Sequence, residues 1–118
     1  MKLEVGMYVR TENGIIGRIY EKIEDMFTYR DNNRDYITYG GLHNEILKAS
    51  HNIIDLIEAG DYVNGSKVMN IVEEDGTKYL VLDRDEVYYD SCLEPSSDND
   101  IKSIVTKEMF ESMQYKVD

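Results

Sequence analysis

The residues of this chain whose side chains could best support a function are carboxylates that alternate with tyrosines in its second half. Carboxylates along a strand edge, with aromatic rings between them, can present a phosphate-like row of charge to a basic protein. The rings of such a surface can anchor the complex. The same acids could instead serve only solubility, and both interpretations stay open. The candidate partner-binding residues are Glu73, Glu74, Asp75, Tyr79, Asp83, Asp85, Glu86, Tyr88, Tyr89, Asp90, Glu94, Asp98 and Asp100.

The charge of the chain is unevenly distributed. Its 118 residues include 13 Lys and Arg against 24 Asp and Glu, which gives a net charge of −11. Residues 1–52 hold seven basic and eight acidic residues, giving −1, whereas residues 53–118 hold six and 16, giving −10. Because phosphate binding depends on clustered Lys and Arg, direct binding to nucleic acid is not expected. The partner that this charge indicates is a basic protein.

Motifs for catalysis and metal binding are weak. Residues 31–35 alternate oxygen ligands like the start of an EF-hand loop, but Tyr36 replaces the turn glycine and Leu42 replaces the bidentate acid. No Cys or second His stands at zinc-ligand spacing from His43 or His51. The sequence contains no nucleophile elbow and no glycine-rich phosphate loop. We therefore expect no enzyme activity, no metal and no cofactor.

The location of the protein can be inferred from its cysteine content and its first residues. A single cysteine, Cys92, cannot form an internal disulfide. The first residues read Met-Lys-Leu-Glu and contain no apolar stretch long enough for a signal peptide or a membrane span. These features predict a cytoplasmic protein that does not associate with a membrane.

One short phrase occurs twice in the chain and sets its expected organisation. Residues 3–9 read Leu-Glu-Val-Gly-Met-Tyr-Val, and residues 57–63 read Ile-Glu-Ala-Gly-Asp-Tyr-Val. If two residues are removed from the first turn, residues 15–19 align with residues 67–71. Such a repeat predicts an internal duplication. Two unrelated β-ribbons with similar first turns remain the alternative.

Turn signals and short apolar runs predict two sets of five strands. Asn13-Gly14, Asn64-Gly65 and Asp75-Gly76 accept the positive φ angles of tight hairpins. We expect a mainly β fold of two tandem SH3-like small barrels packed together, covering residues 1–52 and 53–118, with a short C-terminal helix. The expected strands cover residues 7–11, 15–22, 26–30, 35–39 and 45–49, and then 61–64, 67–74, 77–83, 86–90 and 101–104.

The connector between the two units and the C-terminal segment carry further structural signals. Residues 44–59 fit either a helix or a short strand followed by a turn, and we favour the strand because Ser50-His51-Asn52 are poor helix formers. At the other end, Thr106 is placed to cap a helix over 107–113. Met109, Phe110 and Met113 are then expected to face the core. Residues 115–117 could form a last strand.

Part of the chain resembles known phage sequences. Residues 52–65 and 101–117 are similar to segments of small uncharacterised proteins encoded by phages and prophages of Gram-positive Firmicutes, and they cover about a quarter of the chain. The resemblance brings no catalytic or binding residues. It implies a mobile-element origin and a bacterial host cell, and it favours an inhibitor of host defence or of host enzymes.

Three functions are compatible with these observations. The first is a non-enzymatic phage-type accessory protein whose acidic surface engages a basic host nucleic-acid-processing or defence protein, as an inhibitor or a nucleic-acid mimic. The alternative is an oligomeric scaffold or virion-associated module in which tyrosine-bearing faces contact other subunits. The third is a nucleotide-sequestering protein, which would need a basic pocket formed by Arg10, Arg18, Arg30 and Arg34.

Overall fold

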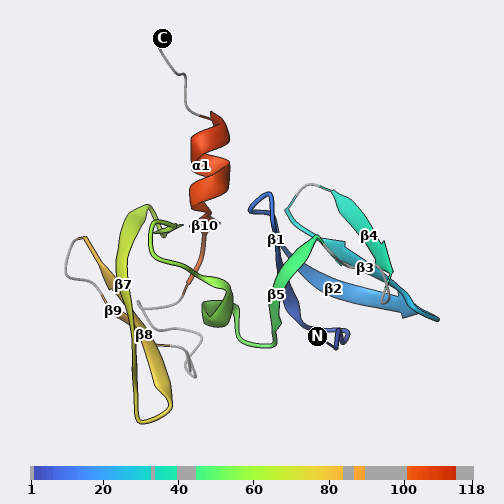
Figure 1. Ribbon diagram of the computed structural model, residues 1–118, viewed down its shortest axis with the longest axis horizontal. Coiled ribbons are helices and arrows are strands. Elements are labelled where there is room, and N and C mark those ends of the chain that lie inside the picture. Colours follow the sequence, from blue (N-terminus) through green and yellow to red (C-terminus); the bar gives the residue numbers. More distant parts are fainter. Residues whose placement is uncertain (1, 33, 40–44, 84–86, 90–100, 114–118) are drawn as a thin grey trace. The chain divides into compact units, whose positions relative to one another are not determined.

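The chain divides into two compact units, each containing its own antiparallel sheet (Figure 1). The computed structural model describes residues 2–32, 34–39, 45–83, 87–89 and 101–113. Unit 1 is Met1–Leu56 and unit 2 is Ile57–Asp118, whereas the predicted boundary followed residue 52. The mainly β prediction is confirmed, but in the described residues each sheet has two unpaired edge strands and does not close into the predicted barrel. In the part of the chain that the structure describes, no helix has the length and apolarity needed to cross a bilayer.

Unit 1 contains a five-stranded antiparallel sheet followed by one turn of 3₁₀ helix. The strand order is β4-β3-β2-β1-β5, so the first strand of the unit lies beside its last strand. The predicted strand-plus-turn interpretation of the connector is therefore confirmed for the described residues. The elements are β1 (Tyr8–Thr11), β2 (Ile16–Ile23), β3 (Met26–Arg30), β4 (Asp35–Tyr39), β5 (Ile46–Ser50) and η1 (Ile53–Leu56).

The core of unit 1 lies on one face of this sheet. Alternate side chains of a strand point to the same face, and the apolar alternation of the sequence selects which face is buried. The ring of Tyr29 stacks on that of Tyr36, with 5.2 Å between the centroids. The buried cluster comprises Leu3, Val9, Ile19, Phe27, Tyr29 and Ile46.

Unit 2 contains a second five-stranded antiparallel sheet followed by an α-helix. Its strand order, β10-β6-β7-β8-β9, again places the first strand of the unit beside the last. Val63, Val68, Leu80 and Leu82 are buried in this unit. The elements are β6 (Tyr62–Val63), β7 (Ser66–Glu74), β8 (Thr77–Leu82), β9 (Val87–Tyr89), β10 (Ile104–Val105) and α1 (Lys107–Met113).

The two sheets correspond strand for strand. In unit 1 the β2–β3 pairing shifts register just after Ile19, and in unit 2 the β7–β8 pairing shifts just after Val68. The amide of Gly6 donates to the carbonyl of Ile19 at 2.8 Å, and the amide of Gly60 donates to that of Val68 at 2.9 Å. Ile19 and Val68 therefore occupy equivalent positions, and the two units share one fold type.

The register of the repeat differs from the one expected from the sequence. Tyr8 pairs with Arg18, ten residues later, whereas the equivalent Tyr62 pairs with Lys67, five residues later. The first hairpin loop of unit 2 is thus shorter by five residues. The predicted alignment of residues 15–19, which removed only two residues from this turn, is wrong for that reason.

The C-terminal helix forms where the cap residue predicts it. The hydroxyl oxygen Oγ1 of Thr106 accepts a hydrogen bond from the amide of Met109 at 3.3 Å, which is the geometry of an N-cap. Phe110 is half-buried and stacks on Tyr62, with ring centroids 4.7 Å apart. Met109 is 37% exposed, so its expected core position is wrong. Because successive helical residues are about 100° apart, Met109 and Phe110 cannot both point at Tyr62. The side chain of Met113 and residues 115–117 lie outside the described residues.

Candidate functional site

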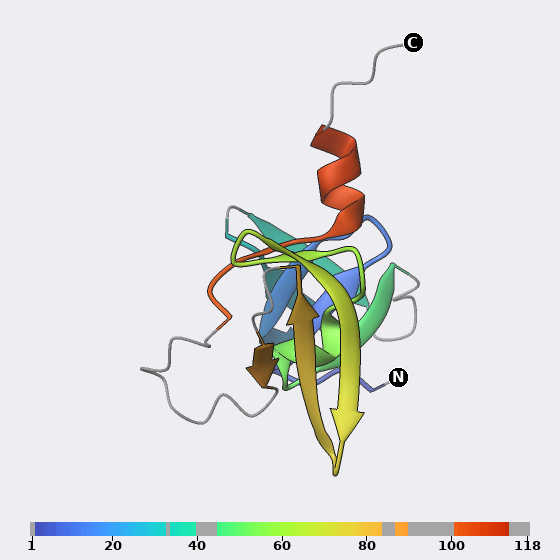
Figure 2. The ribbon, with the colours of Figure 1, turned by 90° about the vertical axis from the view of Figure 1, so that its left-hand side faces the viewer.

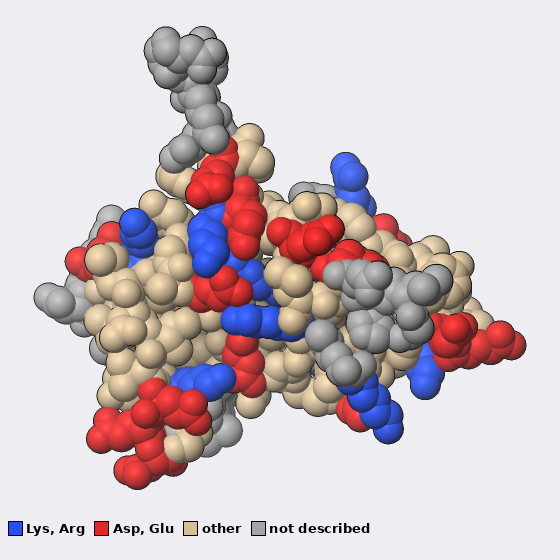
Figure 3. Space-filling view, in the orientation of Figure 1, with Lys and Arg blue, Asp and Glu red and all other residues tan. Residues whose placement is uncertain are grey.

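The hairpin between β7 and β8 carries the described part of the predicted acidic surface. Glu73, Glu74 and Asp75 are exposed at its end, and Asp75 has a φ of 54° in a two-residue turn with Gly76. Asp-Gly accepts the positive φ angles that such a turn requires. The hairpin is seen as a long two-stranded ribbon in Figure 2, and Figure 3 shows acidic side chains gathered where it ends.

This hairpin is longer than its counterpart in unit 1. The β2–β3 hairpin closes with the pair Ile23 and Met26, which corresponds to the pair Val72 and Tyr79 in unit 2. Beyond that pair, unit 2 adds two further pairs, which include the acidic positions 73 and 74. The acidic tip is therefore an extension that the equivalent hairpin of unit 1 does not have.

Tyr79 contributes directly to the acidic tip. Its hydroxyl donates a hydrogen bond to Oε2 of Glu74 at 2.9 Å. Hydrogen bonds to a carboxylate are shorter and stronger than neutral ones, so the tyrosine fixes the position of this charge. Lys78 lies directly opposite Glu73 and reduces the net charge of the tip. The expected combination of acids and a tyrosine is present at Glu73, Glu74, Asp75 and Tyr79.

The other predicted partner-binding residues lie away from this tip or outside the described residues. Asp83 follows the far end of β8, roughly 20 Å from the tip for a strand of this length. Its amide donates to the carbonyl of Lys67 at 3.0 Å. Backbone pairing places Tyr88 and Tyr89 in β9, beside β8. Asp85, Glu86, Asp90, Glu94, Asp98 and Asp100 lie outside the described residues.

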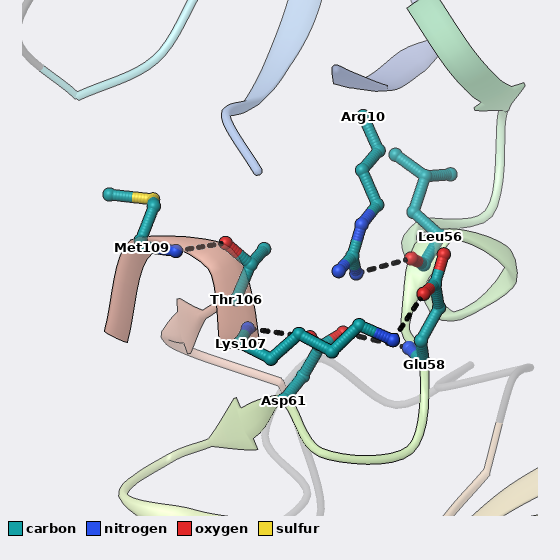
Figure 4. A network of polar contacts seen from close by, with 7 residues as sticks. All are labelled: Arg10, Leu56, Glu58, Asp61, Thr106, Lys107 and Met109. Carbon is teal, nitrogen blue, oxygen red and sulfur yellow. Dashed lines mark hydrogen bonds and ion pairs between the residues drawn. The ribbon is translucent and has the colours of Figure 1, made fainter. Parts of the chain in front are cut away.

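A second polar cluster, at the base of α1, was not expected from the sequence (Figure 4). Asp61 is fully buried, and its two carboxylate oxygens accept the amides of Lys107 at 2.9 Å and of Glu58 at 2.7 Å. The side chains of Lys107 and Glu58 form an ion pair at 2.8 Å, and this hydrogen bond raises the pKa of Lys107. The bond from Lys107 satisfies an amide at the start of the helix, where the helix dipole also favours negative charge. The cluster therefore has a structural role.

Three of the four arginines proposed for a nucleotide pocket are engaged elsewhere. Arg10 is fully buried, and its Nη1 donates to the carbonyl of Leu56 at 2.9 Å (Figure 4). The Nε of Arg30 lies 2.6 Å from Asp35, which holds the pKa of that carboxyl below its usual range. The guanidinium of Arg18 lies 5.2 Å from the centre of the Tyr8 ring. These positions do not favour the nucleotide-sequestering alternative.

The EF-hand-like segment forms a polar turn. One carboxylate oxygen of Asp31 accepts the amide of Arg34 at 2.9 Å, and the other accepts the hydroxyl of Tyr36 at 3.2 Å. His51 pairs with Glu4 at 3.1 Å on the surface. Among the residues that the structure describes, no three His, Cys, Asp or Glu side chains are grouped so as to hold a metal ion.

The chain has no match among protein-family models, curated proteins or solved structures. Functional inference therefore depends on the geometry and charge of its own side chains. The feature whose side chains indicate most clearly what kind of partner could bind is the acidic tip of the β7–β8 hairpin. It is formed by Glu73, Glu74, Asp75 and Tyr79.

Proposed function

We propose that this protein is a non-enzymatic, phage-type binding protein of two tandem SH3-like units, and that unit 2 engages a basic host protein through the acidic tip. The SH3-like assignment is supported by the strand order of both sheets, in which the first strand lies between the second and the last. Its bacterial setting follows from the resemblance of its sequence to phage-encoded proteins. A nucleic-acid-processing or defence protein is the class of partner that an acidic mimic would bind.

The observation that carries the proposal is the hairpin extension. A solubilising charge can be placed anywhere on a surface, but Glu73 and Glu74 stand on residue pairs that unit 1 does not have. The extension is a narrow two-stranded ribbon, which can enter a cleft that a flat sheet cannot. Tyr79 also holds the carboxylate of Glu74 in place, which lowers the entropy lost when that charge binds a partner.

Electrostatics favour a basic partner for this tip. Residues 53–118 have six basic and 16 acidic residues, so long-range attraction guides a basic protein toward unit 2. Such steering raises the association rate more than the affinity, and it weakens when salt screens the charges beyond about 8 Å. Salt dependence of the association rate is therefore the signature to measure.

The proposal can be tested with a variant in which Glu73→Gln, Glu74→Gln and Asp75→Asn are combined. Asn tolerates the positive φ at the turn, so the hairpin should still form. The association rate with a basic host protein, first identified by capture from a Gram-positive lysate, should fall about tenfold at low salt and change little at high salt. The matched control is Glu24→Gln with Asp25→Asn in the shorter hairpin of unit 1, which should leave the rate unchanged. Equal rates for the tip variant and the natural chain at low salt would leave these acids as a solubility feature.

A further inference from the structure

An Asn-Gly pair stands in the first hairpin turn of each unit. Asn13-Gly14 lies between β1 and β2, and Asn64-Gly65 lies between β6 and β7. No other asparagine of the sequence is followed by glycine. In such a pair the backbone nitrogen of the glycine can attack the side-chain amide of the asparagine, because glycine has no side chain to hinder the approach or to restrict the backbone. The two turns therefore hold the same reactive pair in different surroundings.

In unit 1 the asparagine of this pair is open to solvent. Asn13 is exposed, and within the part of the chain that the structure describes no hydrogen bond holds its side-chain amide. The backbone amide of Gly14 donates to the carbonyl of Thr11 at 3.0 Å, which closes a four-residue turn. This backbone hydrogen bond must open before the nitrogen of Gly14 can reach the side chain of Asn13, but the side chain itself can turn freely.

In unit 2 the asparagine of the pair is held by the segment that precedes β10. Oδ1 of Asn64 accepts the amides of Lys102 at 2.8 Å and of Ser103 at 2.9 Å. The backbone amide of Asn64 donates to the carbonyl of Ser103 at 2.9 Å. The side chain must rotate before the nitrogen of Gly65 can attack it, and this rotation breaks both hydrogen bonds to Oδ1. The contacts with residues 102 and 103 therefore oppose the reaction in unit 2.

We propose that Asn13 is a site of spontaneous deamidation and that the fold protects Asn64 from the same reaction. The nitrogen of Gly14 forms a bond to Cγ of Asn13, the Cγ–Nδ2 bond breaks, and the proton of the Gly14 amide leaves with Nδ2 as ammonia. The product is a five-membered cyclic imide. Water then adds across one of the two C–N bonds of the imide and opens the ring, which leaves either aspartate or isoaspartate at position 13. This inference does not depend on the function proposed for the acidic tip.

The modification changes both the charge and the backbone of the turn. Residues 1–52 hold seven basic and eight acidic residues, so the new carboxylate takes their net charge from −1 to −2. Isoaspartate also lengthens the backbone of the turn by one carbon. The amide of Glu12 donates to the carbonyl of Glu45 at 3.0 Å, so the altered backbone lies next to the contact between this turn and the residue before β5. The modified chain is therefore a more acidic form that ion exchange can separate.

Peptide mapping by mass spectrometry tests the proposal on the full chain. Folded chain and chain unfolded in urea are incubated in parallel at mildly alkaline pH, where the attacking nitrogen loses its proton more readily. In the folded chain Asn13 should convert about tenfold faster than Asn64, because the hydrogen bonds to Oδ1 of Asn64 reduce the population of its reactive conformation. In urea, where these bonds are absent, the two positions should convert at similar rates. Far-UV circular dichroism establishes that the folded sample stays folded.

Asn13→Ser is the matched control, because it removes the side-chain amide from the turn of unit 1. It should abolish formation of the more acidic form in the folded chain and leave the rate at Asn64 unchanged. Equal rates at Asn13 and Asn64 in the folded chain would overturn the proposed protection. An unmodified Asn13 in the folded chain, at a time when the unfolded chain has converted, would overturn the proposed site. A difference in urea as large as that in the folded chain would also overturn the proposal, because neighbouring residues rather than the fold would then set the rates.

Discussion

The turn that opens each unit places a glycine beside a basic side chain that follows the last strand of the same unit. A Cβ on Gly6 would lie 3.7 Å from the ring of His51, and a Cβ on Gly60 would lie 3.4 Å from Lys107. His51 pairs with Glu4 at 3.1 Å, and Lys107 pairs with Glu58 at 2.8 Å. Each unit therefore pairs its opening turn with the segment that follows its last strand, and the basic residue differs between the two.

The position after the glycine has a different role in each unit. The amide of Ile19 donates to the carbonyl of Met7 at 2.9 Å, and the amide of Val68 donates to that of Asp61 at 2.8 Å. The backbone contact is the same, but Met7 packs against the core whereas Asp61 holds the start of α1. The same backbone position therefore supports the core in unit 1 and the start of a helix in unit 2, where a carboxylate stands in place of an apolar side chain.

The largest effect is expected at Asp61. Asp61→Ala removes the acceptor of two amides in a buried site and should lower the free energy of unfolding by about 3 kcal/mol. The equivalent Met7→Ala removes only part of an apolar contact and should have a smaller effect. Urea denaturation at neutral pH measures both. Equal losses for the two variants would mean that the carboxylate does not hold the helix.

Alkaline pH should destabilise unit 1 through a residue whose counterpart in unit 2 cannot titrate. Burial raises the pKa of Tyr29 to about 12, whereas the equivalent position holds Leu82. Because the pKa of Tyr29 is higher in the folded chain than in the unfolded chain, its neutral ring contributes fully to stability below the ordinary pKa of 10. That contribution is lost as the pH rises toward 12. The loss should reach about 2–3 kcal/mol, since one pKa unit corresponds to about 1.4 kcal/mol.

Tyr29→Phe is the control for this titration, because it keeps the ring and removes the ionising group. Unfolding free energies of the natural chain and the variant should converge as the pH rises from 9 to 12. Parallel curves for the two proteins would show that other tyrosines cause the alkaline loss.

A smaller effect is expected at the helix cap. Thr106→Ala removes the acceptor for the amide of Met109 and should lower the free energy of unfolding by about 1 kcal/mol. Thr106→Ser keeps the hydroxyl and should recover most of this stability. Thermal unfolding followed at the helical circular dichroism band measures the series, and a Ser variant as unstable as the Ala variant would contradict a capping role.

The smallest effect concerns the exposed pair that opens unit 1. The hydrogen bond from His51 lowers the pKa of Glu4, and the charge of His51 acts in the same direction. The stability that the ionised Glu4 gains from this pair is present above the ordinary pKa of Glu4. It is lost as the pH falls through the lowered pKa. Carboxyl NMR titration should show the low pKa in the natural chain and a return toward the ordinary value in His51→Ala. No change in that variant would show that the pair is not formed in solution.

Local patterns were sufficient to predict the elements of this fold. Strand alternation and three Asn-Gly or Asp-Gly turns located the strands to within a few residues, and Thr106 marked the start of α1. The register of the repeat could not be predicted, because a five-residue difference in one loop leaves no local signal. The exposed position of Met109 was missed because it depends on where Tyr62 lies, far away in the chain.

The candidate site was predictable in composition and only partly in geometry. The acids at 73–75 and Tyr79 come together because they share one hairpin, so their proximity could be inferred locally. Asp83 lies at the other end of β8, although it is close in sequence. The role of Asp61 depends on Lys107, which is 46 residues away. The one available signal was the replacement of Met7 by Asp61 within an otherwise similar phrase.

The position of each first strand beside the last has a consequence for protein synthesis. When the chain leaves the ribosome, β1 has only β2 as a neighbour until β5 emerges some seconds later, at about 5–20 residues per second. β10 is made later still, and it is the strand that closes the equivalent sheet. In a chain that refolds from denaturant, β5 and β10 are available at the same time. Both can then compete for the free edge of β1. Translation removes this competition, because β1 already has its partner when the second closing strand appears.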